Sequence, residues 1–218
     1  MPKHLSFLHT SPVHIASFEH LLNELDPALP RRHMVDESLL QDARATGITP
    51  ALKQRIDNRI AELLADGAGL VLCTCSTIGD YAEQSQPESN CLVMRVDRAM
   101  VEQAVATGEH ILLVAALAST LAPTRQLIQS VALHMQRDVS IQELLCEQAW
   151  QHFERGEQAA YLSAIAAAIR SVAPLPDVII LAQASMSDAS GLCADLPIPI
   201  LSSPRLGLAA ALRSFHAA

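Results

Sequence analysis

The chain has 218 residues, of which 50% are hydrophobic and 17% charged, which is enough apolar material for one domain or two small similar lobes. The net charge of −8 and the lack of a Lys/Arg block argue against binding to nucleic acid or to an anionic membrane. No window reaches the roughly 18 apolar residues of a membrane span, and the first residues lack a signal-peptide pattern. We therefore expect a cytoplasmic protein.

The cysteine count and the histidine spacing argue against disulfides and metals. Five cysteines, an odd number, favour a reduced protein without a disulfide framework. Cys73 and Cys75 are too close together for the usual pair of zinc ligands, and no two histidines have the spacing of a helical metal site. We expect no metal.

Short apolar runs alternate with longer amphipathic stretches. In the first half we expect, in chain order, a strand at His4–His9, a helix at Ser17–Glu24, a strand at His33–Val35, a helix at Thr49–Ala65, a strand at Gly69–Cys73, a helix near Gly79–Gln84, a strand at Leu92–Arg95 and a helix at Asp97–Thr107. In the second half we expect a strand at Ile111–Ala115, a helix at Thr120–Met135, a strand at Val139–Gln142, helices at Cys146–Arg155 and Glu157–Val172, strands at Val178–Ala182 and Ile198–Ser202, and a helix at Pro204–His216. Residues 36–38 are expected in a solvated loop. The alternation predicts an α/β fold with largely parallel sheets.

The sequence also repeats itself. Segments beginning at Leu5, Gly69 and Val93 align with segments beginning at Ile111, Asp177 and Ile200, in the same order and at offsets of 106, 108 and 107 residues. This repeat predicts two similar, pseudo-symmetric lobes, each with a short, mostly parallel sheet flanked by helices. We place residues 1–108 and 200–218 in lobe one, onto which the last helix would return, and residues 109–199 in lobe two. A small ligand would bind in the cleft between the lobes.

Within this pattern Cys75 occupies an informative place. The strand Gly69–Cys73 ends just before it, and Cys75, Ser76 and Thr77 form the turn into a helix. Ligands of α/β sheets bind at the carboxyl ends of strands, and a helix N-terminus there attracts carboxylates. The same field favours a thiolate, so we expect the pKa of Cys75 to lie below the value of about 8.5 for a free cysteine. Cys73, inside the strand, is expected as a small buried hydrophobe.

The stretch "LCTCSTIGD" resembles the first motif of the aspartate/glutamate racemase superfamily, a strand followed by Cys-Asn-Thr. The superfamily includes aspartate, glutamate and hydantoin racemases, maleate isomerase and arylmalonate decarboxylase, and the resemblance extends over nearly the whole chain. It implies that Cys75 is the first-lobe catalytic cysteine and that Ser76 and Thr77 hold the substrate carboxylate. It also implies a cofactor-independent enzyme that acts on a small carboxylate, and a homodimer.

The second-lobe motif departs from the family pattern. The family has strand-Gly-Cys-Thr, whereas this chain has Gln183 in the place of the second cysteine, followed by Ala184 and Ser185 as substrate-binding candidates. A carboxamide can donate and accept hydrogen bonds but cannot act as an acid or base near neutral pH. Racemisation by two thiols is therefore disfavoured.

Three other routes remain open for one thiol. The Cys75 thiolate could add to an unsaturated or carbonyl carbon while the Gln183 amide stabilises the developing oxyanion. The thiol could instead protonate the enediolate left by decarboxylation. A histidine could supply the second acid or base, and His9 is the candidate because it ends the first strand.

Hydroxyl groups near the first strand of each lobe are further candidates for substrate binding. Thr10 and Ser11 follow the first strand of lobe one, and Ser119 and Thr120 follow the first strand of lobe two. They are either ligand contacts or ordinary helix caps. The sequence thus predicts a racemase- or isomerase-like enzyme, with a one-thiol decarboxylase or lyase, or a non-catalytic protein that binds a small acid, as alternatives.

Overall fold

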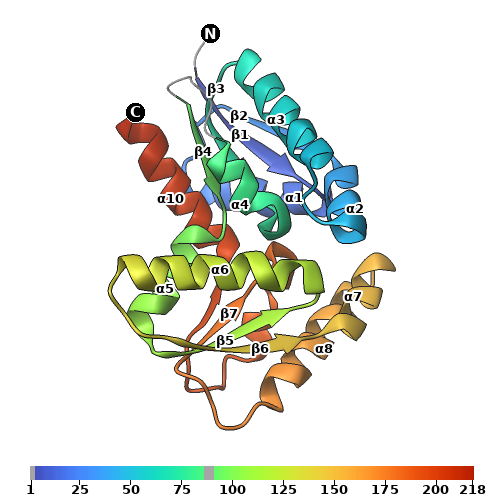
Figure 1. The fold of residues 1–218 in the computed structure, drawn as a ribbon, viewed down its shortest axis with the longest axis vertical. Coiled ribbons are helices and arrows are strands. Elements are labelled where there is room, and N and C mark those ends of the chain that lie inside the picture. Colours follow the sequence, from blue (N-terminus) through green and yellow to red (C-terminus); the bar gives the residue numbers. More distant parts are fainter. Residues whose placement is uncertain (1–2, 86–90) are drawn as a thin grey trace. The chain divides into compact units, whose positions relative to one another are not determined.

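The structure, a computed structural model, describes residues 3–85 and 91–218 (Figure 1). It divides into two compact units. Unit 1 contains the residues up to Val96 together with Pro204–Ala218, and unit 2 contains Asp97–Ser203.

Unit 1 is a four-stranded parallel sheet between two layers of helices. Its strands are β1 (His4–His9), β2 (Arg31–Val35), β3 (Ala68–Cys73) and β4 (Leu92–Arg95), in the order β2-β1-β3-β4. Its helices are α1 (Val13–Leu25), α2 (Glu37–Thr46), α3 (Pro50–Ala65), α4 (Ser76–Gln84) and α10 (Ser203–Ala217). Thr49 caps α3 by accepting a hydrogen bond from the N–H of Leu52 at 3.2 Å, and Pro50 is the first helical residue, as predicted.

Separate hydrophobic clusters hold the two helical layers on the sheet of unit 1 (Figure 1). Helices α2, α3 and α4 pack on one face through side chains such as Leu39, Ile56 and Ile78. Helices α1 and α10 pack on the other face through side chains such as Phe18 and Leu208. A sheet buried on both faces explains why its strands read as continuous apolar runs in the sequence.

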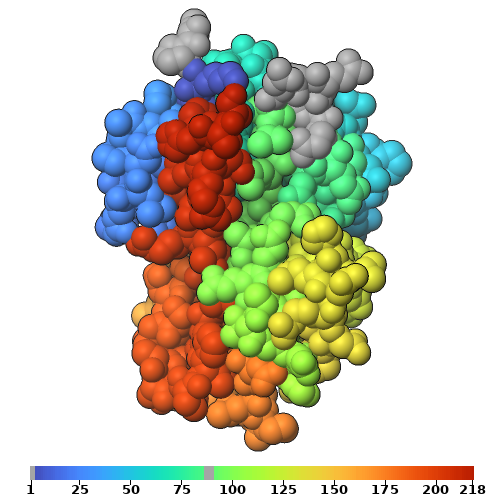
Figure 2. All heavy atoms as spheres, turned by 90° about the vertical axis from the view of Figure 1, so that its left-hand side faces the viewer, coloured from blue at the N-terminus to red at the C-terminus, as the bar shows by residue number. Residues whose placement is uncertain are grey.

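The last helix returns to the first unit, as the sequence led us to expect. Figure 2 shows α10, in red, beside the blue N-terminal segments. Arg205 forms an ion pair with Glu24, and His216 lies 2.9 Å from a carboxylate oxygen of Asp26. These contacts tie α10 to α1 and to the turn that follows it.

Unit 2 repeats the arrangement. Its strands are β5 (His110–Ala115), β6 (Ser140–Leu145), β7 (Val178–Leu181) and β8 (Ile200–Ser202), all parallel and in the order β6-β5-β7-β8. Its helices are α5 (Arg98–Thr107), α6 (Ala118–His134), α7 (Glu147–Glu154), α8 (Gln158–Arg170), the 3-10 turn η1 (Ala184–Met186) and α9 (Ala189–Leu192).

Strand register confirms the internal repeat. Leu8 pairs with Cys73 in the first sheet, and Val114 pairs with Leu181 in the second, at the offsets found in the sequence. The N–H of Thr74 donates to Leu8 O at 3.0 Å, and the N–H of Ala182 donates to Val114 O at 2.9 Å. The predicted fold class, two similar α/β lobes, is therefore correct.

Some boundaries differ from the predicted ones. Helix α5, expected in lobe one, belongs to unit 2, because it packs against α6, β7 and β8. Strand β8 lies in the second sheet, so the chain returns to unit 1 at Pro204 rather than at residue 200.

The prediction that residues 36–38 form a solvated loop is wrong. Asp36 precedes α2, and Glu37 and Ser38 begin that helix. The Asp36 carboxylate is largely buried and pairs with Arg59 at 2.9 Å, which is why a polar stretch is ordered here. The contacts that order it come from α3, far along the chain, and local sequence does not reveal them.

Candidate functional site

Cys75 lies at the carboxyl end of the first sheet, two residues after β3, as the N-cap of α4. Four hydrogen bonds reach its sulfur: from the Thr10 hydroxyl, from the Thr77 hydroxyl, and from the backbone N–H groups of Thr77 and Ile78. The Thr10 contact crosses from the end of β1, and the others come from the first turn of α4. The structure thus brings Cys75, Thr10 and Thr77 together, while Ser76 is the first, buried residue of the helix.

The net effect on the Cys75 thiol is opposite to the one expected. The residue keeps some exposure, but protein packed around the sulfur disfavours a charge there, and this burial raises the thiol pKa. Hydrogen bonds from Thr10, Ile78 and Thr77 act in the lowering direction without cancelling the rise. The donors of the helix N-terminus are therefore present as predicted, but the thiol is protonated at neutral pH. Cys73 is completely buried, as predicted.

His9 is buried beneath the Cys75 turn and is not open to solvent. It ends β1, is 0% exposed, and has a partner at each ring nitrogen: Thr74 Oγ1 lies 2.8 Å from Nδ1, and His33 Nδ1 lies 2.8 Å from Nε2. Burial, followed by the charges of His33 and His14, lowers the pKa of His9 to about 3, so the ring is neutral. Of its neighbours on the loop, Thr10 is buried and Ser11 is half-buried.

Gln183 occupies in unit 2 the place that Cys75 occupies in unit 1. It follows β7 by two residues and is the N-cap of η1. Its side-chain oxygen Oε1 accepts hydrogen bonds from the N–H groups of Ala116 at 2.6 Å and Leu117 at 3.2 Å. By the repeat offset, Ala116 matches Thr10, so the side chains of Cys75 and Gln183 reach equivalent loops. The carboxamide thereby fixes the two residues that lead into α6, at Ala116 and at the N-cap Leu117.

The other predicted residues of unit 2 lie in regular elements. Ser119 and Thr120, expected as ligand contacts or helix caps, are in the first turn of α6, which begins at Ala118. Ala184 is the first residue of η1 and is buried. The Ser185 hydroxyl lies 2.9 Å from the Tyr161 hydroxyl of α8, so one of its hydrogen bonds is used inside the unit.

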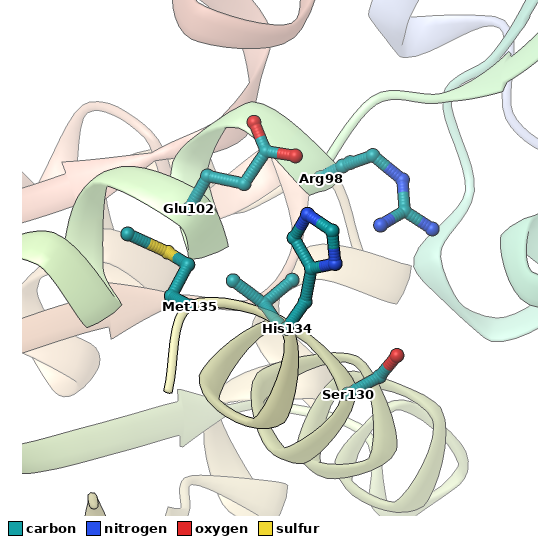
Figure 3. A pocket seen from close by; sticks show the side chains of 6 residues that line it. Arg98, Glu102, Ser130, His134 and Met135 are labelled. Atoms are coloured by element: carbon teal, nitrogen blue, oxygen red, sulfur yellow. The ribbon is translucent and has the colours of Figure 1, made fainter. Parts of the chain in front are cut away.

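A separate cavity of about 560 Å³ lies between α5 and α6 of unit 2 (Figure 3). Arg98 and Glu102 from α5 line one side, and Ser130 and His134 from α6, with Met135 directly after it, line the other. It contains no residue from the carboxyl end of a strand. We therefore do not place the reaction there.

The described residues offer neither a metal site nor a membrane-spanning helix. No three His, Cys, Asp or Glu side chains there are grouped so as to hold a metal ion. No described helix has both the length and the apolar character that a membrane crossing requires. All five cysteines are free.

Solved structures match the chain over almost its full length. The aspartate racemase of Picrophilus torridus superimposes with a TM-score of 0.75 at 18% identity, over 99% of this chain and 95% of that one. The glutamate racemase of Thermus thermophilus, in complex with β-chloro-D-alanine, gives a TM-score of 0.73 at 19% identity, over 99% and 82%. This chain has the racemase fold. A glycine-to-cysteine mutant of arylmalonate decarboxylase in its sulfate-associated form shares that fold, with a TM-score of 0.61 at 13% identity over 98% and 93%. No protein-family model and no curated protein matches the sequence.

The sequence analysis did not single out three side chains that connect with His9: Thr74 in the Cys75 turn, His33 on β2 and Glu19 on α1. His33 pairs in register with Phe7 on the neighbouring strand, and its Nε2 lies 2.8 Å from Glu19 Oε1. A signal was present, because a histidine in the middle of a short strand beside a buried strand faces a partner. Glu19, on a helix, gave no such signal.

We predict that the Gln183 carboxamide is needed for the stability of unit 2 through its oxygen. In Gln183→Leu the N–H groups of Ala116 and Leu117 lose a buried acceptor, which costs about 1–3 kcal/mol. Gln183→Glu keeps an oxygen acceptor and should lose much less at pH 7. Urea unfolding of both variants checks this, and equal losses would contradict it.

Proposed function

We propose that the protein is a cofactor-free enzyme that transfers a proton at the carbon next to a carboxylate, with Cys75 as its one acid–base group. The observation that carries the proposal is the set of four hydrogen bonds onto the Cys75 sulfur. A structural thiol needs no such donors, because a thiol is only a weak acceptor. Donors in this number serve a sulfur that becomes negatively charged during a reaction.

The protonation state of the Cys75 thiol in the free protein determines how the group can act in the reaction. Because burial raises the Cys75 pKa, the group enters the reaction as S–H and can act as a general acid. For an acid with an α-hydrogen, the thiolate fraction of Cys75 first removes the α-proton, which forms S–H and a planar enediolate. In the protonation step the enediolate takes a proton from S–H: a C–H bond forms, the S–H bond breaks, and the thiolate keeps the electron pair. Thr10, Thr77 and the N–H of Ile78 stabilise that thiolate. By resemblance, Ser76 and Thr77 are the expected carboxylate contacts.

A one-thiol decarboxylase is the second candidate, and Gln183 favours it. Inverting the configuration of a carbon by proton transfer needs an acid or base on each face, and a carboxamide supplies neither. Loss of carbon dioxide from a malonate-type acid generates the enediolate without a base, so one thiol completes the reaction. We also predicted from the sequence that the protein is cytoplasmic and homodimeric and that it works without a metal or cofactor. These points stay predictions.

Proton exchange in D₂O tests both candidates. We expect either deuterium at the α-carbon of an amino or hydroxy acid, or carbon dioxide release with one deuterium in the product of a malonate-type acid. NMR and mass spectrometry of the product distinguish them. Loss of either activity in Cys75→Ser supports the proposal. If wild-type protein binds such acids by calorimetry but neither exchanges nor decarboxylates them, it is a binding protein and the proposal is wrong.

A further inference from the structure

A continuous chain of hydrogen bonds joins the turn before Cys75 to the surface of unit 1. Thr74 Oγ1, His9, His33 and Glu19 follow one another with contacts of 2.8 Å at each step. Arg31 closes the chain by donating to both oxygens of Glu19, at 2.8–3.2 Å. We call these first four residues the relay.

Exposure rises along the relay. His9 is 0% exposed, the side chain of His33 is 12% exposed, and that of Glu19 is 33% exposed. The hydrogen bonds from Arg31 lower the pKa of Glu19, and the contact with His33 adds to this, while burial acts the other way. Glu19 is therefore a carboxylate at neutral pH and can only accept a hydrogen bond. His33 must place a proton on Nε2.

When each histidine ring carries one proton, all the hydrogen bonds of the relay must run in the same direction. His33 carries its proton on Nε2 and accepts at Nδ1, so His9 must donate from Nε2. The Nδ1 of His9 is then an acceptor, and the Thr74 hydroxyl donates to it. Every donor in this arrangement is directed away from the Cys75 turn and toward Glu19.

Adding one proton to the relay reverses the direction of the hydrogen bonds between His33, His9 and Thr74. His33 then carries protons on both nitrogens and donates to His9 Nε2, so the neutral His9 ring must hold its proton on Nδ1. This Nδ1–H donates to Thr74 Oγ1, whose own hydroxyl turns to the carbonyl oxygen of Leu8, 3.3 Å away. An acceptor for each arrangement is thus already in place. The two arrangements differ by one proton, which is taken from solvent and held on His33.

We propose that uptake of one proton by His33 switches His9 from its Nε2–H to its Nδ1–H tautomer, and that this reversal polarises the Cys75 turn. His33 and Glu19 are then positioning residues for the proposed thiol chemistry, and this part of the inference rests on the proposed function. In the protonated arrangement the positive ends of the His9 and His33 dipoles are directed at Thr74, the residue before Cys75. A thiolate at Cys75 is favoured in that state.

The surroundings of the two rings restrict the added proton to His33. Phe7 stacks on His33 with ring centroids 4.6 Å apart, and Phe18 covers His9 at 5.7 Å. The titratable or charged groups that face the pair are Glu19 and His14 from α1 and Arg31 from β2. The His14 ring lies 6.4 Å from that of His9, and burial lowers its pKa to about 4. Among these three groups, only Glu19 is negatively charged and so favours a positive charge on a neighbouring ring. Glu19 contacts His33 and not His9.

Ring-nitrogen NMR of ¹⁵N-labelled full-length protein tests the reversal directly. On acidification, His33 should become doubly protonated while His9 stays neutral and moves its proton from Nε2 to Nδ1 at the same midpoint. Glu19→Gln removes the carboxylate that contacts His33 Nε2, so the reversal of the His9 tautomer should require a lower pH than in the parent protein. His20→Gln is the matched control, because His20 also pairs with a glutamate of α1, at 2.9 Å from Glu24, and is 75% exposed. An unchanged His9 tautomer across the His33 titration overturns the proposal.

Alkylation of Cys75 by iodoacetamide, in a variant whose other four cysteines are alanine, tests the effect on the thiol. When the logarithm of the alkylation rate is plotted against pH, the points at higher pH define a line of unit slope. At the acidic pH at which His9 has changed tautomer, the measured rate should be about fivefold higher than this line predicts, which corresponds to about 1 kcal/mol. His33→Phe keeps a ring against Phe7, and its rates should stay on the line. A wild-type rate that also stays on the line overturns the link to Cys75. Neither readout needs substrate, so a failed proton-exchange assay leaves this test intact.

Discussion

Cys75→Ala and Cys75→Ser are expected to lose about 10²–10⁴-fold in kcat while still folding cooperatively. A positioned general acid contributes about 10²–10⁴-fold, and a serine hydroxyl is far too weak an acid to replace the thiol. Cys75 is only partly buried, so its truncation opens little new space in the core. The measurement is steady-state kinetics on the substrate found by proton exchange, beside thermal unfolding of the same samples.

Cys73 supplies the matched control, two residues earlier. It is 0% exposed and belongs to the core cluster under α2–α4. Cys73→Ala should lower the free energy of unfolding by about 1 kcal/mol and leave kcat per folded molecule nearly unchanged. The two substitutions therefore separate chemistry from packing. Residual activity in Cys75→Ala within tenfold of the parent would remove the thiol from the mechanism.

The fold was predictable because its signals are local and repeated. Each strand of a parallel sheet is an apolar run, and the same order of runs occurs twice at a nearly constant offset. The register of Leu8 with Cys73 and of Val114 with Leu181 shows that the offset reflects structure. The position of Cys75 followed from the same rule, since it comes directly after a buried strand.

The properties of the site were less predictable because they depend on long-range contacts. The helix N-terminus beside Cys75 is a local feature and suggested a lowered pKa, whereas the burial that raises it comes from tertiary packing. Gln183 was expected to stabilise a developing oxyanion in the reaction. Its oxygen instead binds Ala116 and Leu117, 67 and 66 residues away in the chain. Its part in catalysis stays a prediction.

Gly207→Ala is the second substitution with a large expected effect, and it concerns the helix that closes unit 1. Alanine at an ordinary helical position stabilises a helix by about 0.5–1 kcal/mol relative to glycine. Here a Cβ would lie 2.1 Å from the carbonyl oxygen of Val96 and 2.7 Å from its Cγ2. The nearest obstacle is backbone, so α10 or the end of β4 has to move. We expect a net loss of about 2–4 kcal/mol in the free energy of unfolding.

The control is Gly191→Ala in α9, where an added Cβ meets no atom within 4 Å. That variant should be neutral or slightly more stable, and urea unfolding of both variants checks the contrast. The chain leaves unit 1 after Val96 and returns at Pro204, so the contact of Gly207 with Val96 joins the two segments at which the chain passes between its units. A Gly207→Ala protein as stable as the parent would show that α10 does not approach Val96 this closely.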